Sequence, residues 1–519
     1  MAKYDGEKFA ANFKAAIPDF RAIVGEKWVA NDEETLFAYR AADSASDDES
    51  FLPSAVISPA SVEEVQAVVR AANVHKTPLW PISTGKNYAY GGPAPRAKGT
   101  GVLDLRRMNK ILEINEKQNY ALVEPGVSYF DLHRELRRRD TKLWVCPAAP
   151  GWGGVMGNAL DRGVGWTPYG DNYAAQCGME VVLPSGELLR TGMGALPNSK
   201  TWQMFKYGFG PYIDGIFTQS NFGVVTKMGM WLMQEPPVVK PVMVSFENED
   251  DLALVVDALA PLRVNGLLPG ALMLFDYLSD AACEFSRSDF EPKKGVLSEA
   301  AKKSMREKLD CGFWNLYTCF YGTQEIVDAC YGIFEATLKK IKGARFFLEG
   351  SRDDKISWKY RMKLMRGQPN MGEFSQLNWI GGGGHMVFAP VLSTDGSEAI
   401  KIYNIVKDMY NQAGFDPILE FAMGGRELHL ITMFFFDRTD PDERKRADEV
   451  FRKSIYACAK EGYGEYRTHL GYMDDVASTY SFNNNALLHF NESIKDAIDP
   501  NGILAPGKSG IWPRSMRGA

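Results

Sequence analysis

A histidine stands directly behind four glycines in the segment LNWIGGGGHMVFAP, residues 377–390. His385 is one of six histidines in 519 residues, so its position asks for an explanation. The imidazole could bind an anion, ligate a metal, act as a base, or begin a buried strand. Metal ligation is disfavoured, because the sequence contains no HxH or HExxH pattern and His429 lies far along the chain.

A tyrosine and an arginine are adjacent in EYRTH, residues 465–469. In a strand Tyr466 and Arg467 would face opposite sides, but at a strand end or in a loop they can converge on one ligand. A guanidinium beside a phenolic oxygen favours the ionised form of the phenol. The alternative interpretation is a surface arginine beside a half-buried tyrosine.

Two glycine-rich stretches, STGKN (83–87) and GWGGVMGN (151–158), could hold a pyrophosphate. Glycine lets a ligand approach the main chain, and Lys86 would add positive charge. The sequence contains no P-loop, no GxGxxG fingerprint and no GxSxG nucleophile elbow. Each stretch alone could be an ordinary turn. Two of them in one half of the chain favour a nucleotide cofactor.

The elements that must position these residues alternate between helix and strand, which favours a sheet covered by helices. We expect a helix over 58–76, with Ser61 and Glu64 as a capping box, and strands over 77–83, 101–105, 179–192 and 221–233. The proline-rich QEPPVVKP, residues 234–241, marks a domain boundary. A chain of this length is expected to form two or three domains.

Composition excludes several classes of protein. The net charge of −6 and pI of about 5.7 argue against a nucleic-acid partner, and the basic RELRRRD (134–140) is expected on a solvated helix face. Seven scattered cysteines predict neither disulfides nor a zinc site. The first twenty residues predict a polar amphipathic helix, not a signal peptide, and no apolar run is long enough to span a membrane. A cytoplasmic location is expected.

Eight segments, spread in order over most of the chain, match those of one known family. They are PISTGKNYAYGGPAPR, GNALDRGVGWTPYGDN, GMEVVLP, RTGMGALP, FTQSNFGVVTKMG, GGGGHMVFAPV, GYGEYRTH and DPNGILAPGKSGIW. Through them the chain resembles the flavoprotein family of vanillyl-alcohol oxidase and p-cresol methylhydroxylase, which includes eugenol and 4-alkylphenol oxidases. The resemblance implies an α+β, two-domain, p-cresol methylhydroxylase-type FAD-binding fold. The FAD-binding domain would comprise residues 1–233 and 464–519, and an α/β cap, residues 234–463, would cover the flavin.

The resemblance also implies FAD bound covalently through its 8α-methyl group to His385. Relatives with a tyrosyl link carry a tyrosine where this chain has Leu377. The four glycines would let the flavin lie close to the histidine. Lys508 would place positive charge near the flavin ring. The further expected cofactor contacts are Ser83, Thr84, Gly85, Lys86, Asn87, Gly157, Asn158, Tyr169, Glu180, Gly223, Val224 and Val225.

The activity that the resemblance implies is oxidation of para-substituted phenols, including 4-alkylphenols, 4-hydroxybenzyl alcohols and eugenol-like compounds. Tyr90, Tyr466 and Arg467 would hold the phenolate while a hydride leaves the para benzylic carbon for flavin N5, giving a p-quinone methide. Glu373, Asp171 and His429 match further active-site positions, where a role in the pocket wall is the alternative. O2 would accept the electrons and give H2O2, and a homodimer is expected. The alternatives are a cytochrome-coupled flavoprotein subunit and a flavin-fold binding protein without turnover.

Two departures from the family pattern concern the substrate pocket, to which Val387 is also assigned. Ala149 replaces an aspartate that relatives carry near the flavin, and Trp166 replaces a tyrosine. That aspartate is thought to assist water addition to the quinone methide. We therefore expect alkylphenols to give a mixture of alcohol and side-chain alkene.

Overall fold

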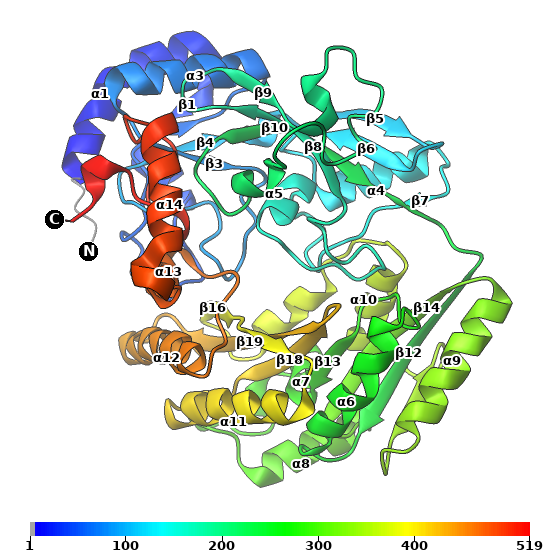
Figure 1. The fold of residues 1–519 in the computed structure, drawn as a ribbon. Coiled ribbons are helices and arrows are strands. Elements are labelled where there is room, and N and C mark those ends of the chain that lie inside the picture. Colours follow the sequence, from blue (N-terminus) through cyan, green and yellow to red (C-terminus); the bar gives the residue numbers. More distant parts are fainter. Residues whose placement is uncertain (1–5, 519) are drawn as a thin grey trace.

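The computed structural model, which describes residues 6–518, has two lobes that meet along a broad contact. Figure 1 shows the amino-terminal segments and the carboxy-terminal helices together in one lobe, and the middle of the chain in the other. We call them the FAD lobe and the cap. The expected amino-terminal helix is α1 (Gly6–Val24), and residues 1–5 of that prediction lie outside the described residues.

The FAD lobe begins with a four-stranded sheet of order β1-β2-β4-β3, in which β2, β4 and β3 are parallel. Ser61 caps α3 by accepting from Glu64 N at 3.2 Å, but the Glu64 carboxylate accepts from Ala60 N at 2.7 Å, one residue earlier than a capping box requires. The elements are β1 (Val29–Ala30), α2 (Glu33–Ala38), β2 (Val56–Ile57), α3 (Val62–His75), β3 (Leu79–Ile82) and β4 (Gly101–Asp104).

A second, antiparallel sheet of order β5-β6-β10-β8-β9 completes this lobe. The basic cluster lies on α4, where Arg134 pairs with Asp131, and Arg138 and Arg139 pair with Glu135, so most of its charge is compensated locally. The elements are β5 (Ile111–Asn115), β6 (Tyr120–Val123), α4 (Tyr129–Arg138), α5 (Val155–Leu160), β8 (Gln176–Val182), β9 (Leu188–Arg190) and β10 (Val224–Trp231), with β7 (Leu143–Trp144) pairing β11 (Met233–Gln234).

The cap is built on an eight-stranded antiparallel sheet of order β15-β12-β14-β13-β18-β19-β16, with β17 also on β19. Its strands are β12 (Val238–Phe246), β13 (Met273–Asp276), β14 (Trp314–Gly322), β15 (Arg345–Leu348), β16 (Gly383–Phe388), β17 (Val391–Ser393), β18 (Ile418–Met423) and β19 (Glu427–Asp437). The sheets thus divide the chain near residue 236, although the exact domain limits stay a prediction.

Helices cover both faces of the cap sheet, because each face carries apolar side chains. One core packs α6 (Asp251–Val264), α9 (Gln324–Leu338), α11 (Gly396–Gln412) and α12 (Pro441–Lys460) against the face away from the FAD lobe. The other core includes α7 (Tyr277–Glu284), α8 (Glu299–Leu309) and α10 (Ile356–Met365), and it extends to Tyr90 and Trp166 of the FAD lobe. This second face therefore borders the junction of the lobes.

The last residues return to the FAD lobe through α13 (Met473–Thr479) and α14 (Phe482–Ile498). Lys495 of α14 is fully buried and donates to Asn221 O at 2.8 Å, Leu504 O at 2.6 Å and Asp499 Oδ2 at 2.6 Å. Burying an ammonium is tolerated when its donors are satisfied in this way. Lys495 thus fixes the carboxy-terminal segment against the loop that precedes β10.

Polar contacts join the lobes at several places. His385 N donates to Asp43 O at 3.0 Å, and Arg438 Nη2 donates to Asp48 Oδ1 at 2.7 Å. Gly151 N donates to Asn370 O at 3.0 Å, and Val391 N donates to Gly464 O at 3.0 Å. An ion pair between Arg452 of α12 and Asp475 of α13 is a further contact. The cap is therefore held to the FAD lobe by more than the two points, near residues 236 and 464, where the chain passes between the lobes.

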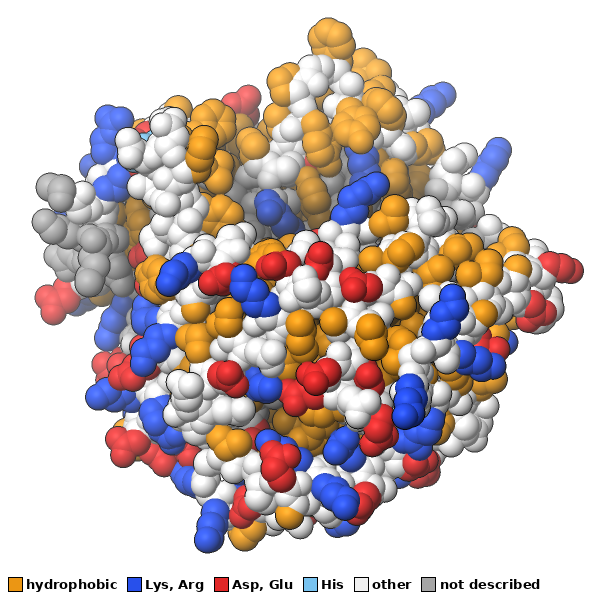
Figure 2. Space-filling view, turned by 60° about the horizontal axis from the view of Figure 1, so that its bottom comes forward, with side chains coloured by type: hydrophobic (Ala, Val, Ile, Leu, Met, Phe, Trp, Pro, Cys, Tyr) orange, Lys and Arg blue, Asp and Glu red, His pale blue; other side chains and the backbone are white. Residues whose placement is uncertain are grey.

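The surface carries no large field of one sign on the face of the cap shown in Figure 2, where acidic and basic side chains are interspersed. Within residues 6–518, no helix has both the length and the apolar character needed to cross a membrane. All seven cysteines are free thiols, and six of them are buried.

Candidate active site

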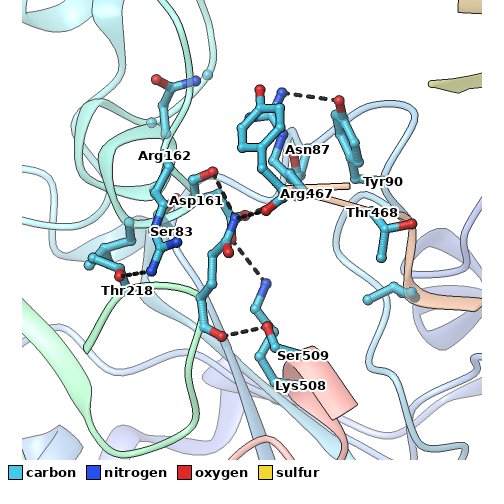
Figure 3. Close-up of a pocket in the computed structure, with 18 of the residues that line it drawn as sticks. Ser83, Asn87, Tyr90, Asp161, Arg162, Thr218, Arg467, Thr468, Lys508 and Ser509 are labelled. Carbon is cyan, nitrogen blue, oxygen red and sulfur yellow. Dashed lines mark hydrogen bonds and ion pairs between the residues drawn. The ribbon is translucent and has the colours of Figure 1, made fainter. Parts of the chain in front are cut away.

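A cavity of about 780 Å³ lies between the lobes and is lined by both of them. This volume is near the upper end of the range for small-molecule and cofactor pockets. The FAD lobe contributes the two glycine-rich stretches and the segment before α13, and the cap contributes β13, β16, β18, β19 and the 3₁₀-helix η6 (Gly372–Asn378). Figure 3 shows a close-up of residues that line it.

The two glycine-rich stretches pack directly against each other. A Cβ atom at Gly154 would lie 2.7 Å from Ser83 Oγ, and one at Gly157 would lie 2.2 Å from the same oxygen. Gly85 has φ of +67°, a conformation that favours glycine. Ser83, Thr84, Gly85, Lys86, Asn87, Gly157, Asn158, Gly223, Val224 and Val225 all line the cavity. This backbone-rich cradle fits the extended pyrophosphate of FAD.

Lys508 lines the cavity as expected, but it is not an isolated cation. Its Nζ donates to Asp161 Oδ1 at 3.0 Å, and Asp161 Oδ2 accepts from Asn87 Nδ2 at 3.2 Å (Figure 3). Asp161 was not predicted from the sequence. The positive charge that Lys508 offers to a cofactor is therefore partly balanced by a carboxylate that also fixes one of the cradle residues.

His385 lies on β16 with its ring stacked on Phe435 of β19, at 4.9 Å between centroids. The histidine lines the cavity, and its buried Nε2 has no hydrogen-bond partner among the described residues. Burial lowers the pKa of His385 to about 4, so the imidazole is neutral at neutral pH. A neutral ring nitrogen with a free lone pair has the character that attachment to a flavin requires. Leu377, at the alternative attachment position, lines the same cavity and is 39% exposed.

The glycines before His385 are explained by the local backbone conformation and by close contact with β19 rather than by the cavity. Gly381, Gly382 and Gly383 have φ between +71° and +80°, which favours glycine. A Cβ atom at Gly382 would lie 2.5 Å from Asp437 Oδ1, and one at Gly384 would lie 2.4 Å from Phe436 O. The expectation that all four glycines make room for the flavin is thus corrected, because β19 occupies the space beside two of them.

Tyr90, Tyr466 and Arg467 meet at one end of the cavity, which we call the phenol end. Arg467 Nη2 donates to Tyr90 Oη at 3.1 Å (Figure 3), and the guanidinium lies 4.2 Å from the Tyr90 ring and 5.7 Å from the Tyr466 ring. Burial raises the pKa of Tyr90, so this phenol stays protonated and can donate. The Tyr466 hydroxyl makes no hydrogen bond within residues 6–518.

The predicted pocket residues Ala149, Trp166 and Val387 also line the cavity. Trp166 stacks on Phe275 of β13 with ring centroids 6.1 Å apart and planes 11° from parallel. Met273, Ile431, Met433 and Phe435 complete this wall. Apart from its polar groups, the pocket is therefore suited to an aromatic ring with an apolar substituent.

Two carboxyl groups, Glu373 on η6 and Glu420 on β18, define a second end that we call the carboxyl end. Neither side chain makes a hydrogen bond or ion pair within residues 6–518. Burial raises the pKa of Glu373 to about 7, and burial together with Glu373 raises the pKa of Glu420 well above its usual range. Glu420 was missed, although it is the one charged residue in the apolar strand sequence ILEFAM.

Four predicted site residues lie outside the cavity lining. Glu180 is buried in the second sheet and pairs with Arg190 and Lys227, both at 2.8 Å. Asp171 is exposed and accepts from Ala174 N at 2.8 Å, which stabilises a turn. Tyr169 is 37% exposed on the same loop. His429 lies behind the wall, with its ring 4.6 Å from that of Tyr466, so it can orient this tyrosine.

Comparisons with known proteins agree with this arrangement. A family model described as FAD binding domain matches residues 53–192, and one described as FAD linked oxidases, C-terminal domain, matches residues 236–509. Fold and site thus define an FAD-dependent oxidoreductase. The chain is 42% identical over 501 residues, 96% of each chain, to the 4-cresol dehydrogenase (hydroxylating) flavoprotein subunit of Pseudomonas putida.

Two solved structures are similar over nearly their whole length. Substrate-bound p-cresol methylhydroxylase has a TM-score of 0.94 and 41% identity over 97% of each chain. The isoeugenol complex of 4-ethylphenol oxidase from Gulosibacter chungangensis has a TM-score of 0.96 and 42% identity over 98% of each chain. The chain belongs to the vanillyl-alcohol oxidase and p-cresol methylhydroxylase family of flavoproteins. The predicted family, fold class and FAD cofactor are confirmed.

Proposed function

We propose that this flavoprotein oxidises 4-alkylphenols and related para-substituted phenols at the carbon attached to the ring. The observation that carries the proposal is the phenol end, where Arg467, Tyr90 and Tyr466 converge on one point of a largely apolar cavity. The 4-cresol and 4-ethylphenol activities named for two relatives support the same substrate class. Bound FAD supplies a hydride acceptor, and every other contribution below comes from the protein's side chains.

The phenol end acts on the substrate oxygen. Arg467 supplies positive charge, while Tyr90 and Tyr466 supply hydroxyl donors, so the substrate binds as a phenolate. Electron density from the phenolate then enters the ring and favours departure of a hydride from the side-chain carbon attached at the para position. Fixed donors in a buried site stabilise such charge without reorganisation, and removal of one donor typically costs about 100-fold to 1,000-fold in rate.

The carboxyl end acts on the quinone methide that remains. An ionised Glu420 or Glu373 accepts a proton from water as the water oxygen bonds to the exocyclic side-chain carbon, and the electron pair of the exocyclic double bond moves through the ring to the carbonyl oxygen beside Arg467, which becomes a phenolate again. The product is an alcohol. Glu420 can therefore act as the base at a site where Ala149 cannot. We propose hydration as the main route, with alkene formation when both carboxyls are protonated.

We propose that FAD is attached covalently to His385. The free, buried Nε2 and the lowered pKa support this attachment. Acid precipitation of the purified protein is expected to give a yellow pellet, and the His385→Ala variant a colourless pellet with a yellow supernatant. If the wild-type pellet is colourless, the flavin is held without a bond to His385.

O2 is the proposed electron acceptor, and a cytochrome is the second candidate because one relative is the flavoprotein subunit of a 4-cresol dehydrogenase. Oxygen uptake and H2O2 formation with 4-ethylphenol, without an added acceptor, separate the two. Turnover that appears only with an added cytochrome or dye would support the second candidate. The homodimer and the cytoplasmic location stay predictions, and analytical ultracentrifugation measures the first.

The proposed substrate class is tested by turnover of 4-ethylphenol with the FAD-loaded protein. The Tyr466→Phe variant is expected to lose most of the activity, because it removes one phenolate donor. Tyr331→Phe is the matched control, since the Tyr331 hydroxyl donates to Glu335 on the cap at 2.9 Å and does not line the cavity. Equal turnover by Tyr466→Phe and Tyr331→Phe would contradict the phenolate mechanism.

A further inference from the structure

A buried cation lies behind the wall of the carboxyl end without lining the cavity. Arg361 of α10 is fully buried. Its guanidinium donates to Asp280, to Ser279 Oγ at 2.8 Å and to Tyr360 Oη at 3.0 Å. A buried ion pair of this kind is weak evidence for stability, because desolvation offsets the attraction. Its location therefore calls for another explanation.

One aromatic ring separates Arg361 from the cavity. The guanidinium carbon lies 3.8 Å from the ring centroid of Phe275, and Phe275 lines the cavity. Phe275 of β13 is also the cross-strand partner of Glu420 on β18. Paired residues of neighbouring antiparallel strands lie side by side on the same face. The positive charge thus lies directly behind the strand pair that carries Glu420.

A hydrogen-bond chain connects the same arginine to Glu373. Ser279 Oγ, which accepts from Arg361, also accepts from Gln376 Nε2 at 3.0 Å. Gln376 belongs to η6, the 3₁₀-helix that carries Glu373. Loss of Arg361 would therefore affect both the charge near the pair and the position of η6.

The charged groups near Glu373 and Glu420 have opposite effects on the ionisation of these two carboxyls. Arg361 favours the ionised form of both Glu373 and Glu420, whereas Asp276, at the start of α7, disfavours ionisation of Glu420. Tyr360 on α10, Tyr317 on β14 and Cys283 on α7 are near Arg361 but are neutral because burial raises the pKa of each. Asp280 is the counter-ion of Arg361, so its carboxylate offsets part of the positive charge that reaches the two glutamates.

We propose that Arg361 is the positioning residue that keeps one carboxyl of the Glu373–Glu420 pair ionised, and so determines whether the substrate leaves as an alcohol or as an alkene. The proposal rests on the proposed function. With one carboxylate present, a water proton moves to it as the C–O bond forms. With both protonated, water has no base to assist its addition, and the quinone methide of 4-ethylphenol isomerises to 4-vinylphenol: its methyl group loses a proton to solvent water, and its carbonyl oxygen gains one.

The first experiment measures the ratio of 4-(1-hydroxyethyl)phenol to 4-vinylphenol as a function of pH with the FAD-loaded protein. Arg361→Met is expected to move the pH of equal product yield upward by about one unit or more, because an opposite charge has been removed. Arg361→Lys keeps the charge and is expected to stay within about half a unit of the wild type, whatever its total activity.

Two further variants separate charge from packing. Arg287→Met removes another buried arginine of the cap, which pairs with Asp416 at 3.3 Å and does not act on either glutamate. It is expected to leave the product ratio unchanged. Asp280→Asn disrupts the same buried ion pair as Arg361→Met but removes the negative charge. The pH of equal product yield is therefore expected to stay the same or to fall in this variant. Upward shifts in both Asp280→Asn and Arg361→Met would overturn the proposal.

An infrared titration of the carboxyl C=O band tests the charge without turnover, with Glu373→Gln and Glu420→Gln to assign the signals. The bands are expected to persist to higher pH in Arg361→Met than in the wild type. An unchanged titration would overturn the role of Arg361 even in an active enzyme. A wild type that does not turn over phenols would defeat the proposed function, while this titration would still test the charge.

Discussion

The two ends of the cavity each have an arginine, but the two arginines act from different distances. At the phenol end Arg467 lines the cavity and donates to Tyr90, so its charge is available to the substrate. At the carboxyl end Arg361 lies behind Phe275 and cannot touch a ligand. The phenol end is organised for one charge state, whereas the carboxyl end contains two carboxyl groups that have no hydrogen-bond partner among the described residues and whose protonation can change. In the proposed function, this difference separates binding of the substrate from choice of the product.

The largest effect is expected from the phenol end. Arg467→Met should lower kcat/KM for 4-ethylphenol by about 1,000-fold, because it removes both the cation and one donor from the phenolate site. Steady-state kinetics measures this loss. A decrease of less than about tenfold would show that the phenol end binds the substrate without stabilising the charge that develops in the reaction.

The next effect concerns the carboxyl end. Glu420→Gln should lower the ratio of alcohol to alkene from 4-ethylphenol by at least about tenfold, since general-base assistance typically contributes about 100-fold or more. The rate at which substrate reduces the cofactor should change much less, and stopped-flow absorbance measures this rate in the variant and in the wild type. An unchanged product ratio would assign the base to Glu373 or to solvent.

The sequence predicts the phenol end better than the carboxyl end. Tyr466 and Arg467 are adjacent, and the cradle residues form short continuous motifs, so their neighbourhood follows from local sequence. Arg361 lies near the strand pair that carries Glu420 only because α10 packs on the face of β13. No local sequence pattern predicts that packing. Glu180 shows the limit of motif matching. Its motif suggested a cofactor contact, but it lies on a fully buried strand and forms ion pairs with Arg190 and Lys227.

A smaller effect is expected on stability. The pKa of Glu373 rises from its ordinary value of 4.5 to about 7 on folding, so the folded state binds the proton more tightly than the unfolded state. That contribution to stability is present below pH 4.5 and is lost as the pH rises through about 7. Glu373→Gln should therefore be more stable than the wild type at high pH, on the order of 2 kcal/mol, and lose this advantage in acid.

Urea unfolding at a series of pH values measures the difference. Glu325→Gln, in the exposed first turn of α9, is the control: hydrogen bonds from its own backbone and from Thr323 lower the pKa of Glu325, so this variant is not expected to gain stability at high pH. A constant difference between Glu373→Gln and the wild type across the pH range would mean that the folded protein does not hold Glu373 protonated.

The smallest effect is expected outside the cavity. Asp171→Asn should change kcat/KM by less than about twofold, because Asp171 is exposed and its Oδ1 only accepts from Ala174 N. Steady-state kinetics with 4-ethylphenol checks this. A large decrease in kcat/KM would instead support the active-site role that the family resemblance gives to Asp171. In that case His429 would have to connect Asp171 to the phenol end.

The contacts between the lobes have a consequence for how fast substrates exchange. Hydrogen bonds from His385 to Asp43, from Gly151 to Asn370 and from Val391 to Gly464, with the Arg438–Asp48 pair, join the lobes at several points of the junction. A hinge opening about the linker near residue 236 would have to break several of them together. Movements of single side chains or short loops break few, and they occur in nanoseconds to microseconds, whereas domain motions take microseconds to milliseconds. Substrate and product are therefore expected to pass through local openings while the two lobes stay joined.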